Sequence, residues 1–164
     1  MWHDAPVQRV RLSDAVLAGD PGDPEGFRAR RDRIGARLGA ERTGASLYEL
    51  PPGQAVCPYH YEHGEEEWVL VLEGRPSART PEGVEQLEPL DLVFFPTGPA
   101  GAHQLRNDTA APVRILMWST VAYPAVTVYP DSGKVGVYTR GRADDLVVER
   151  SSGVGYYAGE AAAD

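Results

Sequence analysis

Apolar residues along the chain fall in short runs, mostly of four to eight residues, separated by segments rich in glycine and proline. Runs of this length between turn residues are typical of β-strands. The chain shows no repeat of fixed period and no long stretch with the apolar spacing of an amphipathic helix. The pattern therefore predicts an all-β fold, either a sandwich or a barrel.

The expected strands cover residues 45–50, 67–73, 77–80, 84–88, 91–96, 102–107, 113–120, 127–130 and 135–139. The sequence Pro-Glu-Gly at 81–83 is expected to turn one strand into the next as a hairpin. Residues 23–41 are ambiguous, because Ile34 suits a helix whereas Gly35 weakens one. We leave that segment unassigned.

Alternation within the segment at 67–73 separates two sets of side chains, since successive residues of a strand point to opposite faces. One face carries Glu67, Val69 and Val71, and the other carries Trp68, Leu70 and Leu72. Both faces are apolar beyond the first residue, so both are expected to be buried.

The length of 164 residues fits one domain, and the apolar fraction of 42% fits a globular chain with a packed core. The formal net charge of −8 disfavours nucleic acid and anionic membranes as partners. We expect an N-terminal extension packed on a barrel (1–40), a barrel core (41–125), and a C-terminal extension (126–164). The extension should wrap the barrel, and its alanine-rich end should be frayed.

The single cysteine, Cys57, excludes an intrachain disulfide and a zinc site made only of cysteines. The N-terminus lacks a basic region followed by an apolar run, and no segment has the length of a membrane span. These features predict a cytoplasmic protein with no membrane partner.

Histidines and carboxylates gather just before the apolar segment at 67–73. His60 and Glu62 share one face of an extended chain, and Glu67 begins the next strand. His103 follows a turn of proline and glycine much later in the chain. Two imidazoles and one or two carboxylates from separate strands make a compact site for a divalent transition metal. A cation would also offset the cost of burying carboxylates in an apolar interior.

Two spaced motifs at these residues resemble those of the cupin superfamily. The first is carried by Gly53, His60, Glu67 and Gly74, with one extra residue before His60 and with Glu62 where a second histidine is usual. The second is carried by Pro96, Gly98, His103 and Asn107, with Leu90 in place of a glycine and two extra residues before His103. Together they span residues 53–107, and their joint occurrence is more specific than either alone.

This resemblance implies a single-domain jelly-roll β-barrel with a metal inside one end. By the same resemblance, His60, Glu67 and His103 would be metal ligands, and Glu62 would fill the position of the second histidine. Such a set of nitrogen and oxygen donors suits iron, manganese or zinc, with nickel and cobalt also compatible.

Several neighbouring residues have plainer interpretations. Glu62 is either a direct ligand or a residue that orients His60 or water. His63 is expected to lie outside the site, on the opposite strand face. Glu65 and Glu66 are expected to be solvated turn residues. Cys57 is expected to be a small buried apolar residue rather than a nucleophile.

Three functional classes follow from a site of this kind. We favour a metal-dependent enzyme acting on a small organic molecule, as an oxygenase or as an isomerase or lyase. The alternatives are a protein that only binds a small ligand and a structural or regulatory protein. We also expect a homodimer, because Trp68, Leu70 and Leu72 face away from the metal side and need cover.

Overall fold

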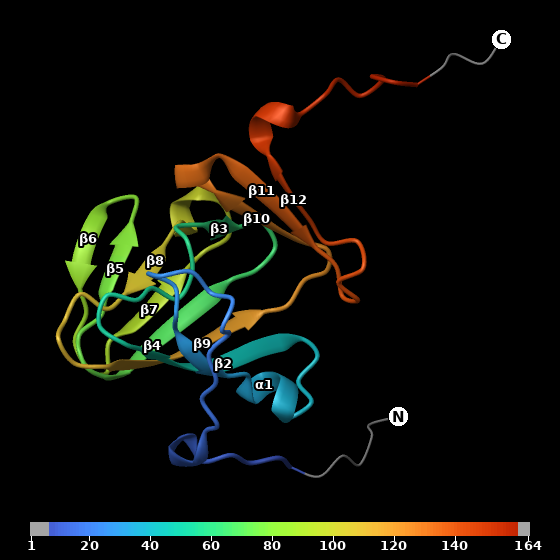
Figure 1. Ribbon diagram of the computed structural model, residues 1–164. Helices are drawn as coiled ribbons and strands as arrows, with labels where there is room; N and C mark the ends of the chain where they lie inside the picture. Colours follow the sequence, from blue (N-terminus) through green and yellow to red (C-terminus); the bar gives the residue numbers. More distant parts are fainter. Residues whose placement is uncertain (1–6, 161–164) are drawn as a thin grey trace.

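The structure is a computed structural model that describes residues 7–160. Most of its regular elements are strands (Figure 1). The strands are β1 (Arg30–Asp32), β2 (Thr43–Leu50), β3 (Tyr61–Glu62), β4 (Glu67–Glu73), β5 (Ser77–Thr80), β6 (Gly83–Gln86), β7 (Leu92–Phe95), β8 (Gln104–Arg106), β9 (Val113–Thr120), β10 (Ala125–Tyr129), β11 (Lys134–Tyr138) and β12 (Leu146–Glu149). One short helix, α1 (Ile34–Arg37), and four 3-10 turns (Leu12–Asp14, Pro99–Gly101, Pro130–Ser132 and Arg150–Ser152) complete the described elements.

The described strands form three antiparallel sheets. Their orders are β1-β2-β9-β4-β7, β12-β11-β10-β3 and β6-β5-β8. The all-β class is confirmed, and β4, β5 and β9 have the bounds expected from sequence. The hairpin also forms as expected, with Thr80 paired to Gly83 across the turn. Three short strands, β1, β3 and β12, were not expected.

One core lies between the five-stranded and three-stranded sheets. Its fully buried members include Val69 and Val71 of β4, Ile115 of β9 and Leu105 of β8. The opposite face of β4 differs from the expectation, because Trp68, Leu70 and Leu72 are only half-buried. Within the described chain, nothing covers that outer face as completely as the core covers the inner one.

The segment left unassigned at residues 23–41 is mostly irregular, apart from β1 and α1. The helix backbone lies directly on β2, where a Cβ atom added to Gly35 would come within 2.7 Å of the backbone nitrogen of Ala45. The glycine that weakens a longer helix therefore permits this close contact. No helix among residues 7–160 has the length and apolar character needed to cross a membrane.

The four-stranded sheet joins two segments that are distant in the sequence, namely β3 and the strands that begin at residue 125. β10 pairs with β3 in a register that sets Thr127 opposite Glu62 and Val128 opposite Tyr61. The expected boundary between the barrel core and the C-terminal extension, at 125/126, falls just after the first residue of β10. The end expected to be frayed, 161–164, lies outside the described residues.

Leu90 has a backbone φ of 76°, in the left-handed region that glycine favours. This is the position where the resemblance to the cupin motif lacks its usual glycine. The Leu90 side chain is 77% exposed, so it contributes little packing. A left-handed conformation costs a residue with a Cβ about 1–2 kcal/mol, partly offset by about 0.5–1 kcal/mol of extra unfolded-state entropy in glycine.

Leu90→Gly is therefore expected to stabilise the fold, raising Tm by about 2 °C. Thermal unfolding followed by circular dichroism measures this change. Leu90→Ala is the matched control, because it also removes the side chain but keeps the Cβ atom, and it should not raise Tm. An equal gain from both variants would show that backbone strain is not the cause.

Candidate metal centre

Backbone pairing holds the two histidines side by side. The amide of His60 donates to the carbonyl of His103 at 3.1 Å, and the amide of His103 donates to the carbonyl of His60 at 2.8 Å. The ring centroids lie 4.7 Å apart. The main chain, rather than the side chains, therefore brings the two motifs together.

The loop before His103 depends on a close contact at Gly101. A Cβ atom there would lie 1.7 Å from the carbonyl oxygen of Pro96, so only glycine fits. The ring of His103 then stacks on Phe95 with centroids 3.8 Å apart, and its Nδ1 contacts the carbonyl of Gly101 at 2.9 Å. The side chain is fixed on both sides.

The hydrogen bonds of the two rings determine which nitrogen is free. A carbonyl only accepts, so Nδ1 of His103 donates to Gly101, and Nδ1 of His60 donates to the carbonyl of Pro58 at 3.0 Å. In the neutral rings, both Nε2 atoms then carry lone pairs. Nε2 of His103 lies 3.3 Å from Oε2 of Glu67, and Nε2 of His60 lies 3.7 Å from the same oxygen.

With both rings neutral, this arrangement points three electron-pair donors at one another and supplies no proton between His103 and Glu67. Nε2 of His103 is buried without a hydrogen-bond partner among the described residues. A buried acceptor facing a carboxylate is destabilising unless a cation lies between them. The donor atoms of His60, Glu67 and His103 all lie within 4.8 Å of one another, and two nitrogens and one oxygen fit a divalent transition metal.

Burial and charge act differently on the two rings. Burial lowers the pKa of His103 to about 4, so this ring is neutral at pH 7. Burial also opposes the charged form of His60, but Cys57 and Glu67 outweigh it and raise its pKa to about 11. Burial raises the pKa of Glu67, but the nearby His60 and His103 rings outweigh burial, so the net shift is downward. A proton on His60 therefore occupies the role that a metal cation would take.

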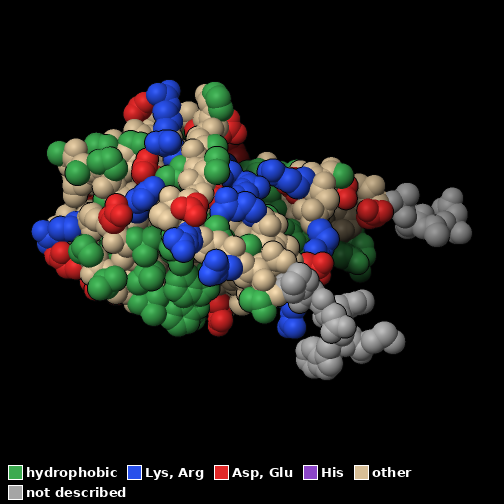
Figure 2. Space-filling model, turned by 90° about the horizontal axis from the view of Figure 1, so that it is seen from below, with side chains coloured by type: hydrophobic (Ala, Val, Ile, Leu, Met, Phe, Trp, Pro, Cys, Tyr) green, Lys and Arg blue, Asp and Glu red, His purple; other side chains and the backbone are tan. Residues whose placement is uncertain are grey.

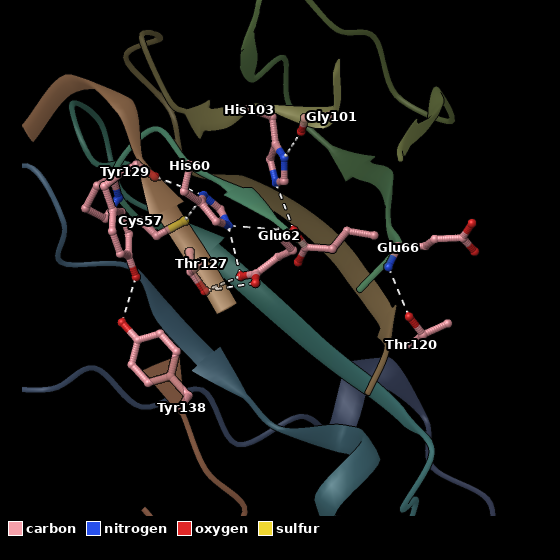
Figure 3. Close-up of polar contacts among 12 residues, drawn as sticks. Cys57, His60, Glu62, Glu66, Gly101, His103, Thr120, Thr127, Tyr129 and Tyr138 are labelled. Atoms are coloured by element: carbon pink, nitrogen blue, oxygen red, sulfur yellow. Dashed lines mark hydrogen bonds and ion pairs between the residues drawn. The ribbon is translucent and has the colours of Figure 1, made fainter. Parts of the chain in front are cut away.

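Glu62 lies beside this cluster and is held by a different partner. Its two carboxylate oxygens lie 2.8 and 2.9 Å from the hydroxyl of Thr127, which donates to one of them (Figure 3). Oε1 is 3.9 Å from Nε2 of His60. Burial raises the pKa of Glu62. A direct bond from Glu62 to a metal stays a prediction, since the cluster of converging donors comprises only the other three residues.

Four neighbouring expectations have mixed outcomes. His63 is exposed and packs its ring edge on Tyr61, outside the cluster, and Glu66 is exposed, both as expected. Glu65 is half-buried and accepts a hydrogen bond from the amide of Ala122, so its assignment as a solvated residue was wrong. Cys57 is only half-buried, and its sulfur lies 3.5 Å from Nδ1 of His60.

A cavity of about 280 Å³ opens beside His60 and Glu62. Its wall is formed by Cys57, His60, Glu62, Glu65, Tyr123, Ala125, Thr127, Tyr129 and Tyr138. The last five residues come from the segment after residue 120, which the sequence did not connect with the site. Only the pairing of β10 with β3 reveals that connection, and no short motif marks it.

Comparisons with known proteins support the fold. The family model described as a cupin domain matches residues 46–119. No curated protein sequence matches the chain. A solved structure described as a "putative sugar phosphate isomerase" from Acidithiobacillus ferrooxidans is 26% identical, with a TM-score of 0.73 over 79% of this chain and 81% of that one.

Two more distant structures share the fold. A sugar phosphate isomerase of the cupin superfamily from Silicibacter pomeroyi is 22% identical, with a TM-score of 0.78 over 88% of this chain and 94% of that one. A polyketide cyclase from Streptomyces resistomycificus is 22% identical, with a TM-score of 0.60 over 73% of this chain and 84% of that one.

Proposed function

We propose that this chain, which belongs to the cupin superfamily, is a metal-dependent isomerase or lyase acting on a small hydroxycarbonyl compound. One observation carries the proposal. Three electron-pair donors converge from His60, Glu67 and His103, and a separate carboxylate, Glu62, lies in the wall of the adjoining cavity. A site with ligands on one side and a proton acceptor on the other suits proton transfer next to a polarised oxygen.

A divalent metal held by His60, Glu67 and His103 would supply Lewis acidity toward a carbonyl or hydroxyl oxygen of the substrate. Glu62 would take a proton from the neighbouring carbon onto a carboxylate oxygen and return it to the product. Thr127 orients that carboxylate by donating its hydroxyl proton to it. The carboxylate of Glu62 in the cavity wall beside the donor cluster is why we favour proton transfer over an oxygenase reaction.

The comparison at 26% identity supports the same class of reaction, since that protein's name refers to an isomerase. The two proteins align over most of both chains. The name describes that protein, and it contributes a reaction class to this proposal rather than a substrate.

Incubation in D₂O tests the proposal. Protein loaded with manganese or zinc is mixed with five- and six-carbon aldoses and ketoses, free and as phosphates, and each compound is followed by NMR. We expect deuterium at the carbon next to the carbonyl of at least one compound, and we expect a chelator to stop the exchange. If the loaded protein binds compounds but exchanges no hydrogen in any of them, it is a binding protein and the proposal is wrong.

We also propose that the protein is a homodimer joined through the outer face of the five-stranded sheet. Trp68 packs against Phe94 with ring centroids 4.5 Å apart and lies parallel to Trp118 at 6.1 Å. Leu92 is 56% exposed and Phe94 is 41% exposed. Figure 2, which views the molecule from below, shows hydrophobic side chains gathered on this side of the surface. An aromatic patch of this kind favours association.

Phe94→Glu is expected to weaken the dimer by at least about 100-fold, because it places a charge in the middle of the apolar contact. Sedimentation velocity at micromolar concentration measures the change. Tyr157→Glu is the matched control, since Tyr157 is also exposed but lies in the C-terminal tail. A wild-type protein that is monomeric at this concentration would contradict the proposal.

The cytoplasmic location expected from the sequence stays a prediction.

A further inference from the structure

The cavity beside the metal cluster has an unusual balance of charge for a site that would take a phosphate ester. Two carboxylates, those of Glu62 and Glu65, line it, and no lysine or arginine is among its lining residues. Glu67, whose carboxylate lies 3.7 Å from Nε2 of His60 in the cavity wall, adds a third negative charge nearby. One divalent ion would not neutralise all three, so an anionic substrate group would meet net repulsion.

Two cations close to the cavity stack on tyrosines of its wall. The ammonium of Lys134 lies 5.6 Å from the ring centre of Tyr129, and the guanidinium of Arg140 lies 5.1 Å from the ring centre of Tyr123. Each therefore stacks on a tyrosine of the wall and does not itself line the cavity. Neither supplies the bidentate contact that phosphate recognition favours.

The cavity wall also carries two phenol hydroxyls. The hydroxyls of Tyr129 and Tyr138 lie 2.8 Å apart, so one donates to the other and one proton remains for a third group (Figure 3). The ring of Tyr129 is stacked near His60, with centroids 6.2 Å apart. Burial raises the pKa of Tyr129, so its hydroxyl stays protonated. Figure 3 shows the tyrosine pair on the side of His60 away from His103.

An occupant of this cavity must donate hydrogen bonds to carboxylates, accept one from a phenol and carry no negative charge. At about 280 Å³ the cavity is also near the lower limit for small-molecule sites, so the occupant is small. Building on the proposed function, we infer that the substrate is an uncharged polyhydroxylated compound, of the class of unphosphorylated sugars. The Tyr129–Tyr138 hydroxyl pair would anchor the end of the sugar farther from the metal ligands.

Isothermal titration tests the inference on protein loaded with zinc or manganese, with metal content measured in each sample. The probes are free five- and six-carbon sugars, the matching sugar phosphates and the matching amino sugars. We expect at least one free sugar to bind at least about tenfold more tightly than its phosphate at low salt. Tighter binding of the phosphate or of the amino sugar, or no binding of any free sugar, would overturn the inference.

Two pairs of variants test which residues determine the affinity for free sugars and the preference over phosphates. Tyr138→Phe removes one hydroxyl of the pair and should weaken free-sugar binding about 5–10-fold, without changing metal content. Tyr156→Phe, in the exposed tail, makes the same change and should have no effect. Glu65→Gln should narrow the preference for free sugar over phosphate about threefold or more, whereas Glu66→Gln, which removes the same charge outside the cavity, should leave it unchanged.

These outcomes separate the inference from the proposed function. A protein that holds no metal fails the proposed function, whatever sugar it binds. A protein that holds metal and exchanges deuterium only into phosphorylated sugars keeps the proposed function and loses the inference. A Tyr138→Phe protein with unchanged sugar affinity would show that the tyrosine pair is not part of the binding site.

Discussion

Replacing His103 with alanine should lower the affinity for zinc or manganese by at least about 100-fold, because it removes one of three converging donors. Competition with a chromophoric chelator measures the affinity. The loss of the ring stacked on Phe95 also opens a gap, so the fold of the variant must be checked by circular dichroism. Glu67→Gln removes the charge with almost no change in volume, and it should lose metal affinity in the same way.

His63→Ala is the matched control, since it removes an imidazole only three residues from His60 but outside the cluster. It should bind metal like the wild type. If His103→Ala and Glu67→Gln both fold and both keep wild-type affinity, the cluster does not hold the metal.

Glu62 gives the second large effect. Glu62→Ala should weaken metal binding about 10–100-fold if the carboxylate is a ligand or fixes one. Glu62→His restores the usual cupin motif and makes the surroundings of the metal one charge more positive, so metal should be retained with a changed preference among iron, manganese and zinc. The first expectation follows from the 3.9 Å separation between Oε1 of Glu62 and Nε2 of His60. The second follows from the position of Glu62 in the motif.

Titration of both variants with the three metals decides this point. Thr127→Val is a useful comparison, because it removes only the hydroxyl that holds the Glu62 carboxylate. Its metal affinity should lie between that of the wild type and that of Glu62→Ala. Unchanged affinity and selectivity in both Glu62 variants would mean that Glu62 has no part in metal binding.

Much of the fold could be predicted because strands have a local signature. The segment Val113–Thr120 is a mostly apolar run that follows turn residues, and β9 forms at these residues. β3 and β12 escaped prediction for physical reasons. β3 has only two residues, and the apolar run of β12, Leu146–Val148, has only three, so both are shorter than the four to eight residues of the expected strands.

The candidate site could be predicted only in part from the sequence. The spacing of His60, Glu67 and His103 is enough to suggest a cluster, and the structure brings their donor atoms together. Thr127 lies 65 residues after Glu62 and Tyr138 lies later still, and only the register between β10 and its neighbours carries them to the cavity. A hydrophobic pattern records burial, but it does not record which distant strand lies opposite.

The position of Leu90 shows how a departure from a motif can be interpreted physically. The motif has glycine there because the backbone is left-handed, and the structure retains that conformation at a φ of 76° with leucine in place. The fold therefore tolerates the strain at an exposed turn. At Gly101 no such tolerance exists, since a Cβ atom would overlap the carbonyl of Pro96.

The central claim is that one divalent ion is held by Nε2 of His60, Nε2 of His103 and a carboxylate oxygen of Glu67. Anomalous X-ray diffraction from crystals of the manganese- or zinc-loaded protein, collected on both sides of the metal absorption edge, tests it most directly. The account predicts a single strong anomalous peak per chain within bonding distance of all three atoms. A peak at another place, or none in crystals of protein shown to be saturated with metal, would contradict it.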